Sequence, residues 1–194
     1  MSKKEIIDFF DGYADHWDAD IVRDESVIKT ILDNAGVKTG VTVLDVACGT
    51  GVLVPDYLAR KVASVTCVDI SPKMIQYARE KFSQPEVHLI CGDVETEHFK
   101  SPFDCIVVYN AFPHFFQPMK LIQKLAGDLK TDGRLTIAHG MSRDNINHHH
   151  SGDASKVSVD LMTLNELGKL FAPYFDVVVK VSNDKMYQMV GIKK

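Results

Sequence analysis

Short β-branched runs that alternate with helical patterns constrain the fold of this chain more than any other feature. Valine, isoleucine and threonine cluster in five runs, at 41–46, 64–70, 86–91, 103–109 and 133–139. Apolar residues at helical spacing lie between them, at about 52–60, 72–82 and 117–129. This alternation predicts a parallel sheet with helices on both faces, and ligands of such sheets bind at the carboxyl ends of the strands.

No repeat, low-complexity tract or linker divides the 194 residues, so we expect one domain, residues 1–194. Helical spacing and several aromatic side chains precede the first strand, and we expect residues 1–38 to form a helical cap. The polar, histidine-rich segment 140–162 is long for a connector. Such segments often bind ligands, so we interpret it as a substrate-side loop or lid.

Two helix starts and one hairpin can be read from local signals. Ser71 and Pro72 are suited to the N-cap and first position of a helix. Thr163 and Glu166 have the spacing of a capping box. Two strand-like runs follow, joined by the turn signal at 183–184, and they predict a terminal β-hairpin at the edge of the sheet.

Composition narrows the possible partners. The formal charge is -4 and no basic run is present, which argues against nucleic acid and anionic membranes as partners. No apolar stretch is long enough to cross a bilayer, and the first residues lack a leader pattern, so we expect a cytoplasmic protein that is a monomer or homodimer. The four cysteines lie singly in or beside apolar runs and are interpreted as reduced, buried packing residues.

The stretch "VLDVACGTGVL" at 43–53 places an acid before a glycine-rich loop. A P-loop needs a Lys-Ser/Thr pair after its last glycine, and Val52 and Leu53 stand there instead. A dinucleotide fingerprint needs a third glycine where this chain has Val54, which weakens the case for NAD. Asp45 would repel a pyrophosphate held at the next helix, so it favours a ligand with a cationic end.

Two further acids follow the next two predicted strands. Asp69 ends the second strand, where nucleoside-binding α/β folds hold a ribose diol with a carboxylate. Asp93 follows the third strand and could accept a hydrogen bond from an adenine amino group. The alternative is that Asp45 caps a helix and Asp69 only terminates a strand.

These motifs together resemble the class I S-adenosylmethionine-dependent methyltransferases along nearly the whole chain. The matching segments, in order, are "VLDVACGTG", "VDIS", "GDVE", "FDCIVVYNAFPHF" and "LKTDGRLTIA". The resemblance implies an α/β fold, a three-layer Rossmann-like sandwich whose seven-stranded, mostly parallel sheet has an antiparallel last strand. It is similar to the small-molecule, quinone-biosynthesis-like branch, whose N-terminal segment resembles "FFDGYADHWD" and covers the cofactor with an aromatic side chain.

The resemblance also implies roles for individual residues. Asp45 would face the methionine amino group, and Asp69 would hold the ribose hydroxyls. Asp93 would meet the adenine amino edge. The full set that the resemblance assigns to the cofactor is Tyr13, Trp17, Asp45, Ala47, Gly49, Gly51, Asp69, Ile70, Met74, Asp93, Val94, Asn110 and Ala111.

Catalytic candidates lie after the fourth and fifth strands. Methyl transfer from a sulfonium is an in-line displacement, so a base is needed only if the acceptor must lose a proton. His114 and His139 could act as that base near neutral pH, and Arg143 could pair with an anionic acceptor; the alternatives are a packed loop histidine and a surface arginine. A set of aromatic residues could cover the methyl group with an apolar surface; the alternative is ordinary core packing. These residues are Phe9, Phe10, Tyr13, Trp17, Phe112, Phe115 and Phe116.

The consecutive histidines at 148–150 raise the question of a metal. Neighbours in a helix point about 100° apart, but in extended chain His148 and His150 share a face and could be joined by His139 or Asp153. A metal is therefore possible but not expected.

The sequence thus predicts an enzyme that transfers a methyl group from S-adenosylmethionine to a small-molecule acceptor. Two alternatives stay open: an NAD(P)-dependent oxidoreductase, against which the Tyr-x-x-x-Lys pattern is missing, and a non-catalytic cofactor- or metal-binding module that uses the histidine-rich loop.

Overall fold

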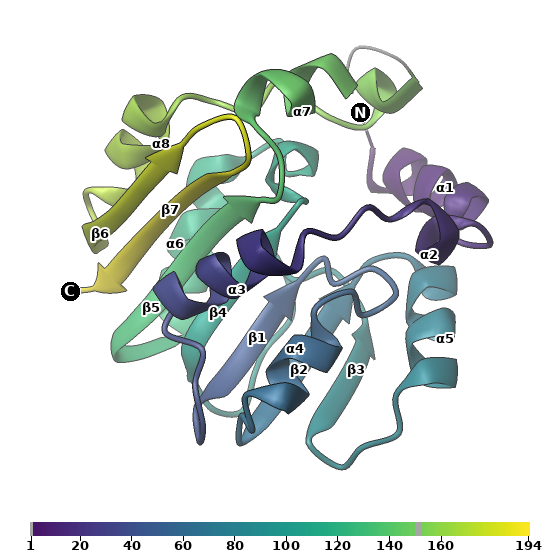
Figure 1. The fold of residues 1–194 in the computed structure, drawn as a ribbon, viewed down its shortest axis with the longest axis horizontal. Coiled ribbons are helices and arrows are strands. Elements are labelled where there is room, and N and C mark those ends of the chain that lie inside the picture. The colour runs from purple at the N-terminus through teal and green to yellow at the C-terminus, as the bar shows by residue number, and fades with distance from the viewer. Residues whose placement is uncertain (1, 150–152) are drawn as a thin grey trace.

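A single seven-stranded sheet organises the chain (Figure 1). The computed structural model describes residues 2–149 and 153–194. Strand order is β3-β2-β1-β4-β5-β7-β6; the first five strands are parallel, and β7 is antiparallel to both β5 and β6. The fold class predicted from the sequence is confirmed. The strands are β1 Thr42–Val46, β2 Ser64–Asp69, β3 Val87–Cys91, β4 Phe103–Tyr109, β5 Leu129–His139, β6 Phe175–Ser182 and β7 Tyr187–Lys193.

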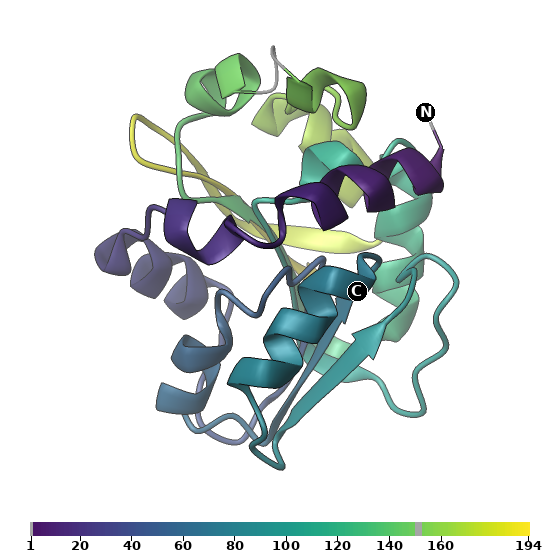
Figure 2. The ribbon, with the colours of Figure 1, turned by 90° about the vertical axis from the view of Figure 1, so that its right-hand side faces the viewer.

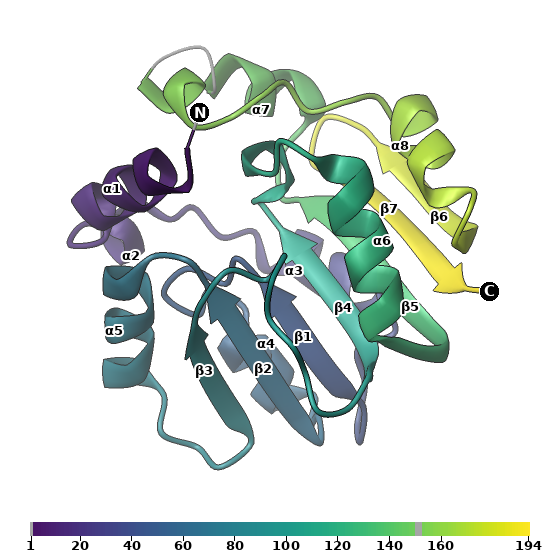
Figure 3. The ribbon, with the colours of Figure 1, turned by 180° about the vertical axis from the view of Figure 1, so that it is seen from behind.

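Helices cover both faces of the sheet, and a further group lies beyond the carboxyl ends of the parallel strands. Figure 3 shows α6 and α8 on the face opposite to α3 and α4. In Figure 2, α1 lies across the tips of the parallel strands. The face helices are α3 Glu25–Asn34, α4 Val54–Ala59, α5 Pro72–Lys81, α6 Pro118–Asp128 and α8 Leu164–Phe171. At the carboxyl end lie α1 Lys3–Tyr13, α2 Trp17–Asp20, η1 Phe112–His114, α7 Arg143–His149 and η2 Asp153–Lys156.

Alternation along the central strands builds two separate cores. In β1, Val43 faces α3, α4 and α5, whereas Leu44 faces α6 and α8. In β4, Val107 and Ile106 divide in the same way. Because both faces of these strands are covered, they read as continuous apolar runs. An odd–even count from Val43 places the side chain of Asp45 on the α4 face.

Local signals confirm the predicted helix starts. The Ser71 side chain accepts from the Met74 backbone N–H, and Pro72 opens α5. Thr163 and Glu166 form a reciprocal capping box at α8. The strand expected at 133–139 begins earlier, at Leu129, because a register shift between β4 and β5 accommodates the extra residues.

One departure from expectation concerns a cysteine. The segment 140–162, expected as a substrate-side loop or lid, contains α7 and η2. Cys48, Cys67 and Cys105 are buried as expected, but Cys91 is exposed because β3 is an edge strand. Within the described residues, no helix is long and apolar enough to cross a membrane.

Gln188 ties α3 to the inserted strand β7, and its loss is expected to destabilise the fold. Its fully buried amide accepts from Asn34 at 2.8 Å and donates to the Ile31 carbonyl at 2.9 Å. Gln188→Ala leaves both partners without this side chain, so we expect the free energy of unfolding to fall by about 2–3 kcal/mol in urea denaturation. Gln76→Ala, at an exposed position of α5, should change it by less than about 0.5 kcal/mol, and equal effects would contradict the assignment.

Candidate active site

A cavity of about 270 Å³ lies at the carboxyl ends of β1, β2 and β4, beneath α1 and α2. It lies where open α/β sheets bind ligands, at the point where the strand order reverses. Ten residues that the sequence assigned to the cofactor line it, namely Trp17, Ala47, Gly49, Asp69, Ile70, Met74, Asp93, Val94, Asn110 and Ala111. His114 lines it as well.

The backbone of the glycine loop is curved by residues with positive φ. Ala47, Gly49 and Gly51 all have positive φ, at 53°, 57° and 84°. This geometry turns the loop back between β1 and α4 and brings bare backbone to the cavity at Gly49. Gly51 serves packing instead, because a Cβ there would lie 2.7 Å from the Phe82 ring, and it does not line the cavity.

Asp69 connects this loop to the end of β2. Its carboxylate accepts from the backbone N–H of Gly49 at 2.8 Å and of Ser71 at 2.9 Å. Burial raises the pKa of Asp69 to about 6, although these two hydrogen bonds oppose the shift. The carboxylate is therefore held in a fixed position on the cavity wall.

Asp45 lies under the loop and not on the cavity wall. Burial, followed by the charge of Asp69, raises its pKa to about 8, against the effect of the Tyr57 hydroxyl. A direct contact between Asp45 and a bound ligand would need the loop or the side chain to move. The reason is alternation: the residue that follows Leu44 points to the α4 face.

The buried Asp45 is expected to make stability depend on pH. Its raised pKa means that the folded protein keeps a proton that the unfolded chain has released, so stability falls as pH rises from about 4 towards 8. Asp45→Asn should remove this dependence. Between pH 6 and 8, its free energy of unfolding should therefore rise relative to that of wild type by up to about 1.4 kcal/mol per pH unit. Urea denaturation across this range tests it, with exposed Asp176→Asn as control; parallel curves for Asp45→Asn and wild type would contradict it.

Beyond Asp69, towards β3, the wall carries an ion pair that the sequence did not indicate. Lys3 of α1 pairs with Asp93, and with Glu95 at 3.3 Å. Ile70, Met74 and Val94 supply apolar wall on the same side. A lysine in an exposed first turn gives no pattern in the sequence, so only the docking of α1 reveals this contact.

Polar contacts fasten the cap to α5 and to the glycine loop. Asp11 accepts from the Ser71 hydroxyl, and Asp15 accepts from the Tyr77 hydroxyl at 2.8 Å. Asp18 of α2 accepts from the Thr50 hydroxyl of the loop and pairs with Lys81 of α5 at 2.6 Å. No residue of α1 or α2 is fully buried. The cap is therefore held largely by surface polar contacts, each individually weak.

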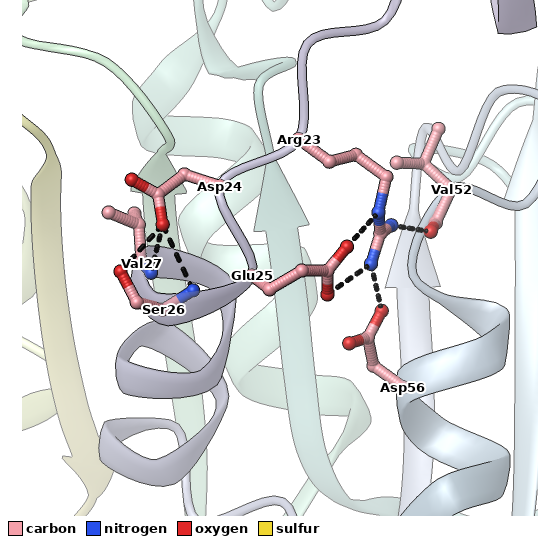
Figure 4. A network of polar contacts seen from close by, with 7 residues as sticks. All are labelled: Arg23, Asp24, Glu25, Ser26, Val27, Val52 and Asp56. Carbon is pink, nitrogen blue, oxygen red and sulfur yellow. Dashed lines mark hydrogen bonds and ion pairs between the residues drawn. The ribbon is translucent and has the colours of Figure 1, made fainter.

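A second network joins the chain between α2 and α3 to the glycine loop, and sequence reasoning missed it (Figure 4). Arg23 donates to the Val52 carbonyl just after the loop and pairs with Glu25 and with Asp56 of α4, both at 2.9 Å. The neighbouring Asp24 caps α3. Glu25 and Asp56 raise the pKa of Arg23 above its usual value, chiefly through the hydrogen bond to Glu25.

The end of β4 forms the remaining wall. Asn110 has a positive φ of 53° and accepts from the Gly140 backbone N–H at 2.9 Å. The His114 Nδ1 lies 2.9 Å from the Val157 carbonyl oxygen, and its ring packs edge-on against Phe10, with centroids 5.0 Å apart. Because a carbonyl only accepts, Nδ1 carries a proton, and in the neutral ring Nε2 then has the lone pair.

The other candidates do not come together at the cavity. Tyr13 is 47% exposed and packs on Phe9. His139 is buried at the end of β5, beside the Tyr187 ring. The Arg143 Nε donates to the Leu161 carbonyl at 2.8 Å, in a separate surface depression.

The metal hypothesis gains no support from the described part of the chain. His148 is exposed on α7, and His150 lies outside the described residues. Among residues 2–149 and 153–194, no group of three or more potential ligands could hold a metal ion.

Comparison with known proteins finds similarity to methyltransferases. Residues 43–133 match the family described as a methyltransferase domain. Over 141 residues the chain is 32% identical to a malonyl-(acyl-carrier protein) O-methyltransferase of Acetivibrio thermocellus, which covers 71% of this chain and 50% of the relative. The mitochondrial ubiquinone biosynthesis O-methyltransferase of Schizosaccharomyces pombe is 33% identical over 105 residues, 52% of this chain and 38% of that one. The chain thus spans half or less of the length of these curated relatives.

Solved structures share the fold over its whole extent. The N-methyltransferase NodS of Bradyrhizobium japonicum, in complex with S-adenosyl-L-homocysteine, has a TM-score of 0.75 at 14% identity and covers 100% of this chain and 99% of its own. The magnesium protoporphyrin IX methyltransferase of Synechocystis, with the same ligand bound, has a TM-score of 0.75 at 16% identity and covers 100% of both chains. Residues 43–133 thus match a methyltransferase domain, and the chain is similar to curated and solved methyltransferases, in agreement with the resemblance that the sequence motifs carry.

Proposed function

We propose that the protein transfers the methyl group of S-adenosylmethionine to a small-molecule acceptor. The observation that carries the proposal is the cavity at the switch point of the sheet, where a glycine cradle at Gly49 lies beside the fixed carboxylate of Asp69. Both relatives named above are O-methyltransferases, one named for malonyl-(acyl-carrier protein) and one for ubiquinone biosynthesis. The acceptor is therefore proposed only as a class.

The residues present fit the cofactor. Asp69 would hold the ribose hydroxyls, and Asp93 would meet the adenine amino group between the apolar side chains of Ile70 and Val94. The positive φ of Gly49 leaves room for the methionine part to approach the backbone. Bound there, the cofactor would supply an electrophilic methyl group on a sulfonium.

His114 would act as the general base for an acceptor that must lose a proton. Its contact with the Val157 carbonyl fixes the tautomer in which Nε2 can accept that proton. Three aromatic residues line the cavity together with His114 and would exclude water from it. They are Phe10, Phe115 and Phe116. Segment 140–162, which contains Val157, would act on the acceptor side, and residues 1–38 would act as the cap.

Isothermal titration with S-adenosylhomocysteine tests the proposal. NADH, the ligand expected for the alternative oxidoreductase, is titrated in the same way. We expect binding of S-adenosylhomocysteine with a dissociation constant in the micromolar range and none of NADH. Absence of S-adenosylhomocysteine binding at millimolar concentration would refute the proposal. The comparisons give no support to the oxidoreductase or to the metal-binding module. A cytoplasmic location and a monomeric or homodimeric state stay predictions from the sequence.

A further inference from the structure

Three phenylalanine side chains line the cavity near the end of β4. Phe115 and Phe116 directly follow η1. Phe10 reaches the same place from α1, because its ring packs edge-on against His114, with centroids 5.0 Å apart. All three are only half-buried, and we call them the aromatic wall. Covering apolar surface is favourable by about 25 cal/mol per Å², so the aromatic wall favours an apolar ligand.

The charged side chains of the cavity lie at its other end. Among the described residues, those that line it are Lys3, Asp69, Asp93 and Glu95. Asp69 ends β2, whereas Asp93 and Glu95 follow β3 and pair with Lys3. In the strand order β3-β2-β1-β4, β1 separates them from the aromatic wall. Three acids and one lysine leave two excess negative charges, and the single positive charge of a sulfonium would balance only one of them.

The nearby arginines do not supply a cation to the aromatic wall. Arg23 does not line the cavity, and its guanidinium is bonded to the three partners drawn in Figure 4. Arg143 lies in a separate surface depression. Tyr109, Asn110 and Gln117 add polar groups without charge on the β4 side. An anion at the aromatic wall would lose hydration without gaining a lysine or arginine partner, which costs several kcal/mol.

We propose that the acceptor is an uncharged molecule with an apolar ring, and that the aromatic wall holds this ring beside the cofactor. The inference rests on the proposed function and names the substrate class within it. Aromatic rings pack edge-on or offset with centroids about 4.5–7 Å apart, so three phenylalanines can contact one ring from different sides. Carboxylates, phosphate esters and ammonium compounds are excluded as acceptors.

Three ring compounds of similar size and different charge test the substrate class. At pH 8, 4-methylphenol is neutral, since the pKa of a phenol is about 10, and an unperturbed imidazole is neutral as well. Benzoate is an anion and benzylammonium is a cation. Each is titrated by NMR into the complex with S-adenosylhomocysteine. We expect 4-methylphenol to bind with a dissociation constant of about 1 mM, and both ions at least tenfold more weakly. Equal or tighter binding of either ion, or no binding of 4-methylphenol, would overturn the proposal.

Phe116→Ala tests where the ring binds. Removing this side chain should weaken 4-methylphenol at least fivefold and change S-adenosylhomocysteine affinity by less than threefold. Tyr13→Ala is the matched control, because Tyr13 is an aromatic residue of α1 that is 47% exposed and does not line the cavity. It should change neither affinity. Wild-type affinity for 4-methylphenol in Phe116→Ala would overturn the assignment to the aromatic wall. If wild type does not bind S-adenosylhomocysteine, the proposed function itself fails, which is a different result.

Discussion

Asp69→Asn is expected to lower the affinity for S-adenosylhomocysteine by about a hundredfold or more. A carboxylate can accept from two ribose hydroxyls, and each such charged hydrogen bond contributes about 1.5–3 kcal/mol. The amide keeps the size of the side chain but presents one oxygen instead of two. Titration calorimetry measures the effect, and a loss of less than threefold would show that Asp69 does not hold the ligand.

The same variant has a structural cost that can be measured separately. Asp69 also accepts from the backbone N–H groups of Gly49 and Ser71, one on each oxygen. The amide would leave one of them without an acceptor, so the free energy of unfolding should fall by about 1–3 kcal/mol. Asp176→Asn, exposed on β6, is the control for both measurements and should change neither. If the variant loses much more free energy of binding than free energy of unfolding, Asp69 acts in binding.

His114→Gln is expected to lower kcat by about 10²- to 10⁴-fold, the contribution of a positioned general base. Binding of S-adenosylhomocysteine should change by less than threefold, because the proposed function assigns His114, which lines the cavity, to the acceptor and not to the cofactor. The acidic limb of the pH–rate profile should also disappear. The measurement is steady-state formation of S-adenosylhomocysteine with an acceptor that wild type methylates. His98→Gln, at an exposed position, should retain wild-type kcat.

The tautomer of His114 can be determined without an acceptor. The contact of Nδ1 with the Val157 carbonyl predicts the form protonated at Nδ1, which ¹⁵N NMR of the imidazole reports directly. If the neutral ring is protonated at Nε2 instead, His114 is not the base that faces the cavity. Unchanged kcat in His114→Gln would exclude it as well.

Local and periodic signals were enough to predict the sheet. Short β-branched runs between helical patterns have few ways to bury both faces of a sheet, which predicted parallel strands, and the turn signal at 183–184 predicted the terminal hairpin. The acids Asp69 and Asp93 were found because the carboxyl ends of parallel strands meet at one edge. Position in the chain relative to a strand end was therefore the informative signal.

Side-chain direction limited the rest of the site. Asp45 lies one residue before the end of β1, whereas Asp69 ends β2, and the Asp45 side chain turns to the α4 face beside Tyr57. His139 ends β5 and Arg143 follows it, one strand further from the cavity; His139 lies beside the Tyr187 ring, and Arg143 donates to the Leu161 carbonyl. Being close to a strand end in sequence did not decide which of these side chains reached the ligand edge.

The sequence by itself determined the order of strands and helices, the glycine loop and its acids, and the resemblance to methyltransferases, because these depend on near neighbours in the chain. Only the tertiary structure decided how the cap lies over that loop, since the contacts of Lys3, Trp17 and Arg23 join residues tens of positions apart. Their partners were fixed when α1 and α2 packed across the strand ends. No local pattern encodes that packing, because no residue of α1 or α2 is fully buried and both helices are fastened by polar contacts to α5 and the glycine loop.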